Sequence, residues 1–279
     1  MKSLSFVIPC LNEEKTLPIV LEKINKVRES MVGSYNTEVV VSDNGSRDNS
    51  IEIAKRFSAR VVNCSTTGYG AALKYGIENA VGDIIIFADA DDTYNFYESP
   101  ALIQELENGF DLVIGDRING KIHKGAMPWM HRYLGTPVLT FIINRLYSTK
   151  TNRISDCNSG FRCFKKKSFL EWEVKSDGME FASEMLVNAL VAKARISHVP
   201  VEIHPDHKER QPHLKTWTDG MRHLLQIFIS APNFFFNLGV ALFIISWLII
   251  AIGYLKGTIL IGIFSIFGIH SMMLALIGT

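Results

Sequence analysis

The chain has few cysteines, and they are not spaced for a zinc site or a disulfide framework. Its 279 residues include four, none of which forms a C-x-x-C pair: Cys10, Cys64, Cys157 and Cys163. Structural zinc sites and small secreted scaffolds both need closely spaced cysteines. We therefore expect free thiols in a reducing compartment.

The chain also lacks an excess of charge of either sign. Its 29 Lys and Arg nearly balance its 28 Asp and Glu, for a net charge of +1. This balance argues against a nucleic-acid partner, which would need a surplus of basic residues. The opening stretch MKSLSFVIPCLNEE is too short and too polar for a signal peptide, so we expect residues 1–230 in the cytosol.

Charge is almost absent from the C-terminal segment. Between residues 234 and 279 the only formally charged residue is Lys256. As a helix, residues 234–255 would measure about 33 Å, enough to cross a bilayer, and residues 258–278 are nearly as apolar. The sequence predicts two transmembrane helices in a multi-pass protein whose larger domain lies on the cytoplasmic face. A buried helical hairpin in a soluble core is the alternative.

Acidic residues are absent between residues 117 and 155, where seven Lys and Arg alternate with aromatic and aliphatic side chains. This pattern predicts a helix over about 126–148 that lies in a membrane interface. An ordinary amphipathic helix packed on the domain is the alternative. Residues 213–232 predict a second, juxtamembrane amphipathic helix.

The first 115 residues alternate between short apolar runs and helical patterns. The runs predict strands at 4–8, 38–42, 60–63, 83–88 and 111–115. Apolar residues at helical spacing follow a predicted helix start at 12–14, namely Leu17, Val20, Leu21, Ile24 and Val27. Further helices are predicted at 69–80 and 100–106. The alternation predicts an α/β fold with a mainly parallel sheet, in which ligands bind at the carboxyl ends of strands.

Three carboxylates follow the fourth predicted strand within four residues: Asp89, Asp91 and Asp92. Like charges this close raise one another's pKa, and a hard divalent cation would remove that penalty. A solvated acidic loop or a helix N-cap is the alternative that these residues alone leave open.

Seven segments, in order, resemble the family 2 glycosyltransferases of GT-A fold. They are VIPCLNEE, VVVSDNGSRDNS, GYGAALKYGIENAVGDIIIFADADDTYN, VIGDR, SDCNSGFRCF, GMEFASEML and KTWTDGMRHL, spanning about residues 5–225. Within that family the chain is similar to the polyprenyl-phosphate glycosyltransferases, which include dolichyl-phosphate mannose synthase. The resemblance implies a GT-A catalytic domain over 1–212. It would transfer a sugar from a nucleotide-sugar to polyprenyl phosphate, with inversion and with Mg²⁺ or Mn²⁺. A UDP-glucose-like donor is favoured over GDP-mannose.

The resemblance also implies roles for individual residues on the donor side. Contacts to base and ribose fall to Pro9, Asn12, Glu14 and Asp43, with Gly70 and Lys74 close to the nucleotide. Asp89 and Asp91 form the D-x-D motif, which holds the metal on the donor diphosphate. Thr93 stands where related synthases often have Gln, so the third ligand is open.

On the acceptor side, Asp156 matches an acidic residue near the reacting centre, and Glu184 is a second candidate with a surface carboxylate as its alternative. A lipid phosphate is mostly ionised at neutral pH, since comparable monoesters have a second pKa of about 6. We therefore expect Asp156 to orient groups, with general-base catalysis as the alternative. Cations for the acceptor phosphate are Arg117, which ends the fifth strand, and then Arg132, Arg162, Lys208 and Arg210. Contact with lipid headgroups alone is the alternative for these residues, and a structural role is the alternative for Arg162.

Two other functions fit parts of the sequence. A membrane polysaccharide synthase usually carries a Q-x-x-R-W signature on an interface helix, and KTWTDGMRHL lacks it. A non-catalytic membrane scaffold would have no need to keep Asp89, Asp91 and Asp156. Homo-oligomerisation is possible, and the sequence does not decide it.

Overall fold

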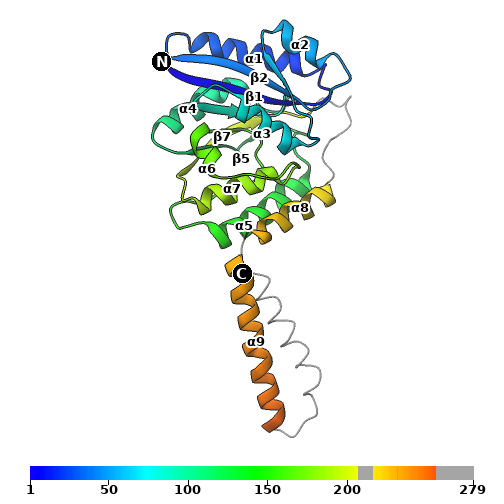
Figure 1. Ribbon diagram of the computed structural model, residues 1–279, viewed down its shortest axis with the longest axis vertical. Helices are drawn as coiled ribbons and strands as arrows, with labels where there is room; N and C mark the ends of the chain where they lie inside the picture. The colour runs from blue at the N-terminus through cyan, green and yellow to red at the C-terminus, as the bar shows by residue number, and fades with distance from the viewer. Residues whose placement is uncertain (207–215, 231, 256–279) are drawn as a thin grey trace. The chain divides into compact units, whose positions relative to one another are not determined.

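The computed structural model describes residues 1–206, 216–230 and 232–255, and the chain divides into two compact units, Met1–Gln226 and Ile227–Thr279. The first unit holds a seven-stranded sheet in the order β3-β2-β1-β4-β6-β5-β7. Figure 1 labels β1, β2, β5 and β7 of this sheet together with the helices that surround it. β6 runs antiparallel to both of its neighbours, and every other pairing is parallel. The strands are β1 (Lys2–Cys10), β2 (Tyr35–Asp43), β3 (Arg60–Asn63), β4 (Ile84–Phe87), β5 (Leu112–Ile122), β6 (Arg162–Lys165) and β7 (Ile196–Ile203).

Helices connect most of these strands. They are α1 (Leu17–Ser30), α2 (Ser50–Arg56), α3 (Tyr69–Asn79), α4 (Ser99–Glu107), α5 (Thr136–Tyr147), α6 (Lys166–Glu171), α7 (Phe181–Val191), α8 (Thr216–Ile229) and α9 (Pro232–Leu255). A 3-10 turn, η1 (Phe96–Glu98), precedes α4, and a π-helical turn, η2 (His131–Gly135), precedes α5.

Both faces of the sheet are covered. Successive side chains of β1 point to opposite faces, and those of both faces are buried. Leu4, Phe6 and Ile8 belong to the core cluster that also contains the buried side of α1. Val7 points to the other face, where α3 approaches closely. A Cβ added to Gly76 would lie 2.6 Å from Val7 Cγ1, so only glycine permits this approach.

The predicted α/β class with a mainly parallel sheet is confirmed, and so are the five predicted strands. The five apolar residues predicted to line the first helix are the buried residues of α1, although that helix begins at Leu17 and not at 12–14. β6 and β7 were not predicted. β6 has only four residues and begins with Arg162, while β7 is an edge strand that contains Pro200, and proline within a strand is typical of edges.

The structure corrects the prediction of a multi-pass membrane protein with its larger domain on the cytoplasmic face. The helix α9, Pro232–Leu255, covers the first predicted span, at 234–255. Over the described part of the chain, no helix has both the length and the apolar character needed to cross a bilayer. The predicted span at 258–278 lies outside the described residues.

The helix predicted at 126–148 is shorter in the structure and has two apolar sides. Leu139 and Ile143 of α5 are buried against the domain, as the alternative of a packed amphipathic helix requires. Trp129, Tyr133 and Phe141 are nevertheless 67 to 70% exposed. Packing on the domain therefore accounts for only one side of this segment. The predicted helix at 213–232 is present as α8, and residues 213–215 lie outside the described part.

Candidate functional site at the carboxyl ends of the strands

The loops that follow β1 and β2 are joined by hydrogen bonds at one edge of the sheet. Parallel pairing sets Cys10 opposite Asp43, which brings the two strand ends together. Asn12 Oδ1 accepts from the Arg47 backbone N–H at 2.8 Å, and Glu14 Oε2 accepts from that of Asn49 at 3.1 Å. The residues predicted to contact base and ribose therefore lie on two loops that support each other.

Asp43 and Asn44 have separate structural tasks in this region. Asp43 is 4% exposed, and its Oδ2 accepts from the Gly45 backbone N–H at 3.0 Å, which closes the turn after β2. Asn44 donates to the Thr66 carbonyl at 2.7 Å and accepts from the Gly68 N–H at 2.8 Å. It therefore joins the loop after β2 to the segment that enters α3, a contact beyond local turn chemistry.

Asp89, just beyond the end of β4, is held by groups from two other parts of the chain. The Tyr69 hydroxyl, at the start of α3, donates to Asp89 Oδ1 at 2.8 Å. Burial first, and then the Asp89 charge, raise the pKa of Tyr69, so its proton stays on oxygen as this bond requires. Gly160 lies against the same carboxylate, since an added Cβ there would sit 2.8 Å from Asp89 Oδ2.

The other two carboxylates of the acidic loop point to different partners. Asp91 Oδ1 accepts from both the backbone N–H of Thr93, at 3.0 Å, and its hydroxyl, at 2.6 Å. Asp92 forms an ion pair with Lys23 of α1 at 2.6 Å. The acidic loop is therefore not a three-carboxylate cluster. Its candidate ligands for a cation are Asp89 and Asp91, both hard oxygen donors of the kind that Mg²⁺ and Mn²⁺ prefer.

Arg117 of β5 and Asp156 form a two-pronged ion pair in the interior. Arg117 Nε and Nη2 donate to the two carboxylate oxygens at 2.7 and 2.8 Å, and Asp156 is fully buried. Burial acts to raise the pKa of Asp156, but the Arg117 guanidinium outweighs it and holds that pKa below its ordinary value. Burial acts to lower the pKa of Arg117, and Tyr94 and Asp156 reverse that shift. Both partners are therefore charged at neutral pH.

Tyr94 is hydrogen-bonded to Gly160, the residue that lies against Asp89. Its hydroxyl oxygen accepts from the Gly160 N–H at 2.7 Å, and its ring packs on Phe161 with centroids 5.6 Å apart. Burial raises the pKa of Tyr94 to about 12, an effect that Arg117 opposes and that Asp89 and Asp156 reinforce. The phenol therefore stays neutral between two groups of opposite charge.

Three of the predicted site residues lie together elsewhere. Lys74 pairs with Asp177 at 2.7 Å, and Glu184 is 5% exposed and accepts from the Ser176 N–H at 2.7 Å. A Cβ on Gly70 would lie 2.5 Å from the Ser176 carbonyl oxygen. These residues fasten α3 and α7 to the loop at 175–178, so their contacts describe a packing role.

The basic residues proposed for the acceptor are also separated. Arg162 is fully buried and donates to the carbonyl oxygens of Ser159 and Cys157 at 3.0 and 3.1 Å, so it stabilises the chain turn and is not accessible to a lipid phosphate. Arg132 is exposed, with its guanidinium 5.3 Å from the Tyr133 ring centroid. Lys208 and Arg210 lie outside the described residues.

Sequence reasoning missed Tyr69, Tyr94 and Gly160, the three residues that contact or separate the charged groups. Tyr69 and Tyr94 flank recognised motifs, but no local pattern predicts that either hydroxyl reaches another loop. Gly160 was recognised only as part of S-G-F-R. A side chain has no room there because of Asp89, which lies 71 positions earlier in the chain. These contacts arise because β6 returns between β4 and β5.

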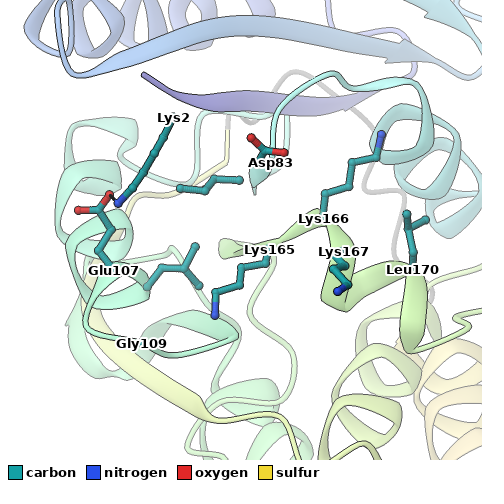
Figure 2. A pocket seen from close by; sticks show the side chains of 10 residues that line it. Lys2, Asp83, Glu107, Gly109, Lys165, Lys166, Lys167 and Leu170 are labelled. Carbon is teal, nitrogen blue, oxygen red and sulfur yellow. Dashed lines mark hydrogen bonds and ion pairs between the residues drawn. The ribbon is translucent and has the colours of Figure 1, made fainter.

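A cavity of about 620 Å³ lies at the other end of the strands, away from the candidate site (Figure 2). Its lining includes Lys2 at the start of β1, Asp83 just before β4, and Glu107 and Lys165. These are the amino ends of the parallel strands, whereas ligands of such sheets bind at the carboxyl ends. Lys2 and Lys165 are already paired, with Glu107 and Asp111. We therefore do not assign this cavity to the donor or the acceptor.

The order of strands and helices corresponds to the GT-A fold that the sequence predicted. The sequence matches the family described as Glycosyl transferase family 2 over residues 5–170. The chain belongs to this family, and it is a glycosyltransferase.

Individual relatives agree with this assignment. The low-salt glycan biosynthesis hexosyltransferase Agl6 of Haloferax volcanii is 35% identical over 260 residues, covering 90% of this chain, which spans 61% of that relative's length. A dolichyl-phosphate hexose transferase of the same organism is 28% identical over 202 residues, which cover 71% of this chain and 81% of that protein's length. The glucosyl-3-phosphoglycerate synthase of Mycobacterium tuberculosis, solved with Mn²⁺ and UDP, superposes with a TM-score of 0.65. Its 20% identity, over 82% of this chain and 80% of its own, shows a shared fold alone.

Proposed function

We propose that this protein transfers a hexose from a nucleotide-sugar to polyprenyl phosphate, with the help of a divalent cation and with inversion at the anomeric carbon. The observation that carries the proposal is the loop at 156–160, in which Asp156 pairs with Arg117 and Gly160, four residues later, lies against Asp89. This supports a site that combines a cation for a phosphate with carboxylates for a metal. The name of the dolichyl-phosphate hexose transferase supports a lipid phosphate as acceptor.

Asp89 and Asp91 would hold Mg²⁺ or Mn²⁺ on the donor diphosphate. When bound, the cation neutralises the charge that develops on the departing nucleoside diphosphate. Tyr69 binds one oxygen of Asp89, and Thr93 binds one oxygen of Asp91. The orientation of both carboxylates is therefore set before the donor arrives. The complex of the fold neighbour with Mn²⁺ and UDP supports this assignment without deciding between the two metals.

Pro9, Asn12, Glu14 and Asp43 form the part of the site proposed for base and ribose. Their loops are tied to each other, which makes the surface rigid before binding. Carboxylate and amide oxygens accept hydrogen bonds from base N–H groups and ribose hydroxyls. The preference for a UDP-hexose over GDP-mannose as donor remains a prediction from the sequence resemblance.

In the proposed reaction, an oxygen of the lipid phosphate forms a bond to the anomeric carbon. The bond from that carbon to the donor diphosphate breaks on the opposite face, and its electron pair leaves with the nucleoside diphosphate. Arg117 aligns the acceptor phosphate, and Asp156 holds the guanidinium in place. Because Asp156 is ionised, fully buried and bound by both oxygens to Arg117, we assign it to positioning and not to general-base catalysis.

The exposed apolar side chains of the 129–141 segment are proposed to receive the prenyl chain. Trp129, Tyr133 and Phe141 are exposed, and Leu134 and Val138 of the same segment are 54 and 45% exposed. The segment meets the site through Thr140 of α5, whose hydroxyl accepts from the backbone N–H of Cys157, next to Asp156, at 3.3 Å. A lipid lying along this surface would place its phosphate near the Arg117–Asp156 pair.

The direct test is a panel of UDP- and GDP-hexoses, each incubated with the full chain, a polyprenyl phosphate and Mg²⁺ or Mn²⁺. We expect one donor to label the organic-extractable lipid. EDTA should abolish that labelling, and added divalent cation should restore it. Labelling of a water-soluble glycan, with none of the lipid, would contradict the proposed acceptor, and full activity in EDTA would contradict the metal.

Gly160→Ala tests whether the position of Asp89 matters. The new methyl group would sit 2.8 Å from Asp89 Oδ2, so the carboxylate must move. We expect the divalent cation concentration for half-maximal activity to rise about 10-fold, the size of effect seen when the support of a metal ligand is lost. Gly220→Ala is the control, because that site in α8 is open. Equal metal dependence of the two variants would contradict the role of Asp89.

A further inference from the structure

Two histidines and a glutamate lie together where β5 and β7 end. The strands pair in parallel, with Ile122 opposite Ile203, so His123 and His204 follow at neighbouring positions. Their rings stack with centroids 4.4 Å apart and planes 20° from parallel. Glu202 Oε2 lies 3.0 Å from His123 Nε2. The candidate ligand atoms of the three residues all lie within 4.8 Å of one another.

This combination has the chemistry of a transition-metal site. Two imidazoles and one carboxylate form a known zinc set, usually completed by water, whereas Mg²⁺ favours oxygen ligands alone. Zinc holds such ligands at about 2.0 to 2.2 Å, which places them about 3.4 Å apart. Rotation of these side chains, 32% exposed for His123 and 38% for Glu202, would close the remaining separation.

One neighbouring basic residue competes with a metal ion for the Glu202 carboxylate. Lys121 also reaches Glu202, at 3.3 Å, but both side chains are more than a third exposed, which weakens this competition.

We propose that His123, Glu202 and His204 bind one divalent transition-metal ion of the zinc class, separately from the Asp89–Asp91 pair. Within the described residues, no other group of three or more His, Cys, Asp or Glu brings its ligand atoms this close together. The inference does not depend on the proposed acceptor or donor, since it uses residues outside that assignment.

An ion at this position would stabilise the acidic loop. The His204 backbone N–H donates to the Thr93 carbonyl at 2.9 Å, and Tyr94 forms an isolated bridge with Ile203. Thr93 in turn holds Asp91. Fixing His204 to His123 therefore restrains the segment that carries Asp91.

The test is Zn²⁺ binding by the full chain without a polyhistidine tag, stripped of metal and titrated by calorimetry, with Co²⁺ absorption as a second readout. We expect one equivalent to bind, and His123→Ala and His204→Ala each to weaken binding at least about 100-fold, because each removes a direct ligand. Zn²⁺ should also raise the unfolding temperature of the parent chain and leave that of His204→Ala unchanged.

Two control variants separate this site from its neighbours. Asp91→Asn should bind Zn²⁺ as the parent does, and Lys121→Met should bind it no more weakly, since it removes only a competing cation. The proposal is overturned if the parent chain binds no Zn²⁺. It is also overturned if Asp91→Asn loses the site while His204→Ala keeps it, because the ion would then belong to the acidic loop.

Discussion

Asp91→Asn is expected to lower the rate of sugar transfer by about 10²- to 10³-fold or more, the effect of removing one group that stabilises developing charge in a transition state. The amide keeps the shape of the carboxylate, and its Oδ1 can still accept from the Thr93 N–H and hydroxyl. The loop should therefore fold as before, while the charge that holds the cation is lost. The measurement is lipid-linked product per unit time at saturating donor and metal.

The neighbouring carboxylate provides a matched control. Asp92→Asn changes the same functional group one position along, but Asp92 pairs with Lys23 of α1 and not with the proposed metal. We expect it to retain most of the activity. Circular dichroism and thermal unfolding should match the parent chain for both variants. An active Asp91→Asn, or an Asp92→Asn that is equally inactive, would refute the assignment of the metal to Asp89 and Asp91.

Asp156→Asn is expected to destabilise the domain by about 3 to 5 kcal/mol, the cost of removing one partner of a buried ion pair. Asp156 is fully buried, and the Arg117 side chain is only 14% exposed, so the guanidinium would be left without its counterion inside the protein. Transfer activity should fall as well, because Arg117 loses the group that holds it. Urea unfolding at neutral pH measures the first effect, and Glu52→Gln, which breaks a pair exposed at the surface, should change stability little.

The same ion pair predicts a pH dependence of stability. Folding lowers the pKa of Asp156 below its ordinary value of 3.8, so folded protein binds this proton less readily than the unfolded chain does. Its contribution is therefore complete above about pH 5 and is lost progressively as the pH falls through the ordinary value of 3.8 and then the lower, folded pKa. Unfolding free energies measured from pH 6 downward should decline more steeply for the parent chain than for Asp156→Asn. Parallel curves would contradict the shift.

The order of elements could be predicted from the sequence because each depends on local residues. The buried side of α1 follows directly from Leu17, Val20, Leu21, Ile24 and Val27 at helical spacing. The strand before the acidic loop follows from the uninterrupted run of residues 84–87, all buried in the structure. The same local patterns put Asp43 and Asp89 at strand ends, and the parallel sheet then places them on one edge.

Local patterns failed where a residue's surroundings come from distant segments. Arg162 and Arg117 are both arginines near strand ends, yet Arg162 is enclosed by its own turn while Arg117 meets Asp156. Lys74 and Glu184 looked like candidates for the site and instead bind the loop at 175–178. The C-terminal segment, with Lys256 as its only formally charged residue, was interpreted from its length and apolar composition, and no helix of the described residues has the length and apolar character needed to cross a bilayer.

The sequence by itself determined the α/β class, the glycosyltransferase family and the acidic loop after β4, since these depend on neighbours in the chain. Only the tertiary structure decided which charges meet. The antiparallel insertion of β6 between β4 and β5 brings Gly160 to Asp89, and the pairing of β5 with β7 brings His123 to His204. The physical reason is that burial and charge pairing act over a few ångströms in space, whatever the separation along the chain.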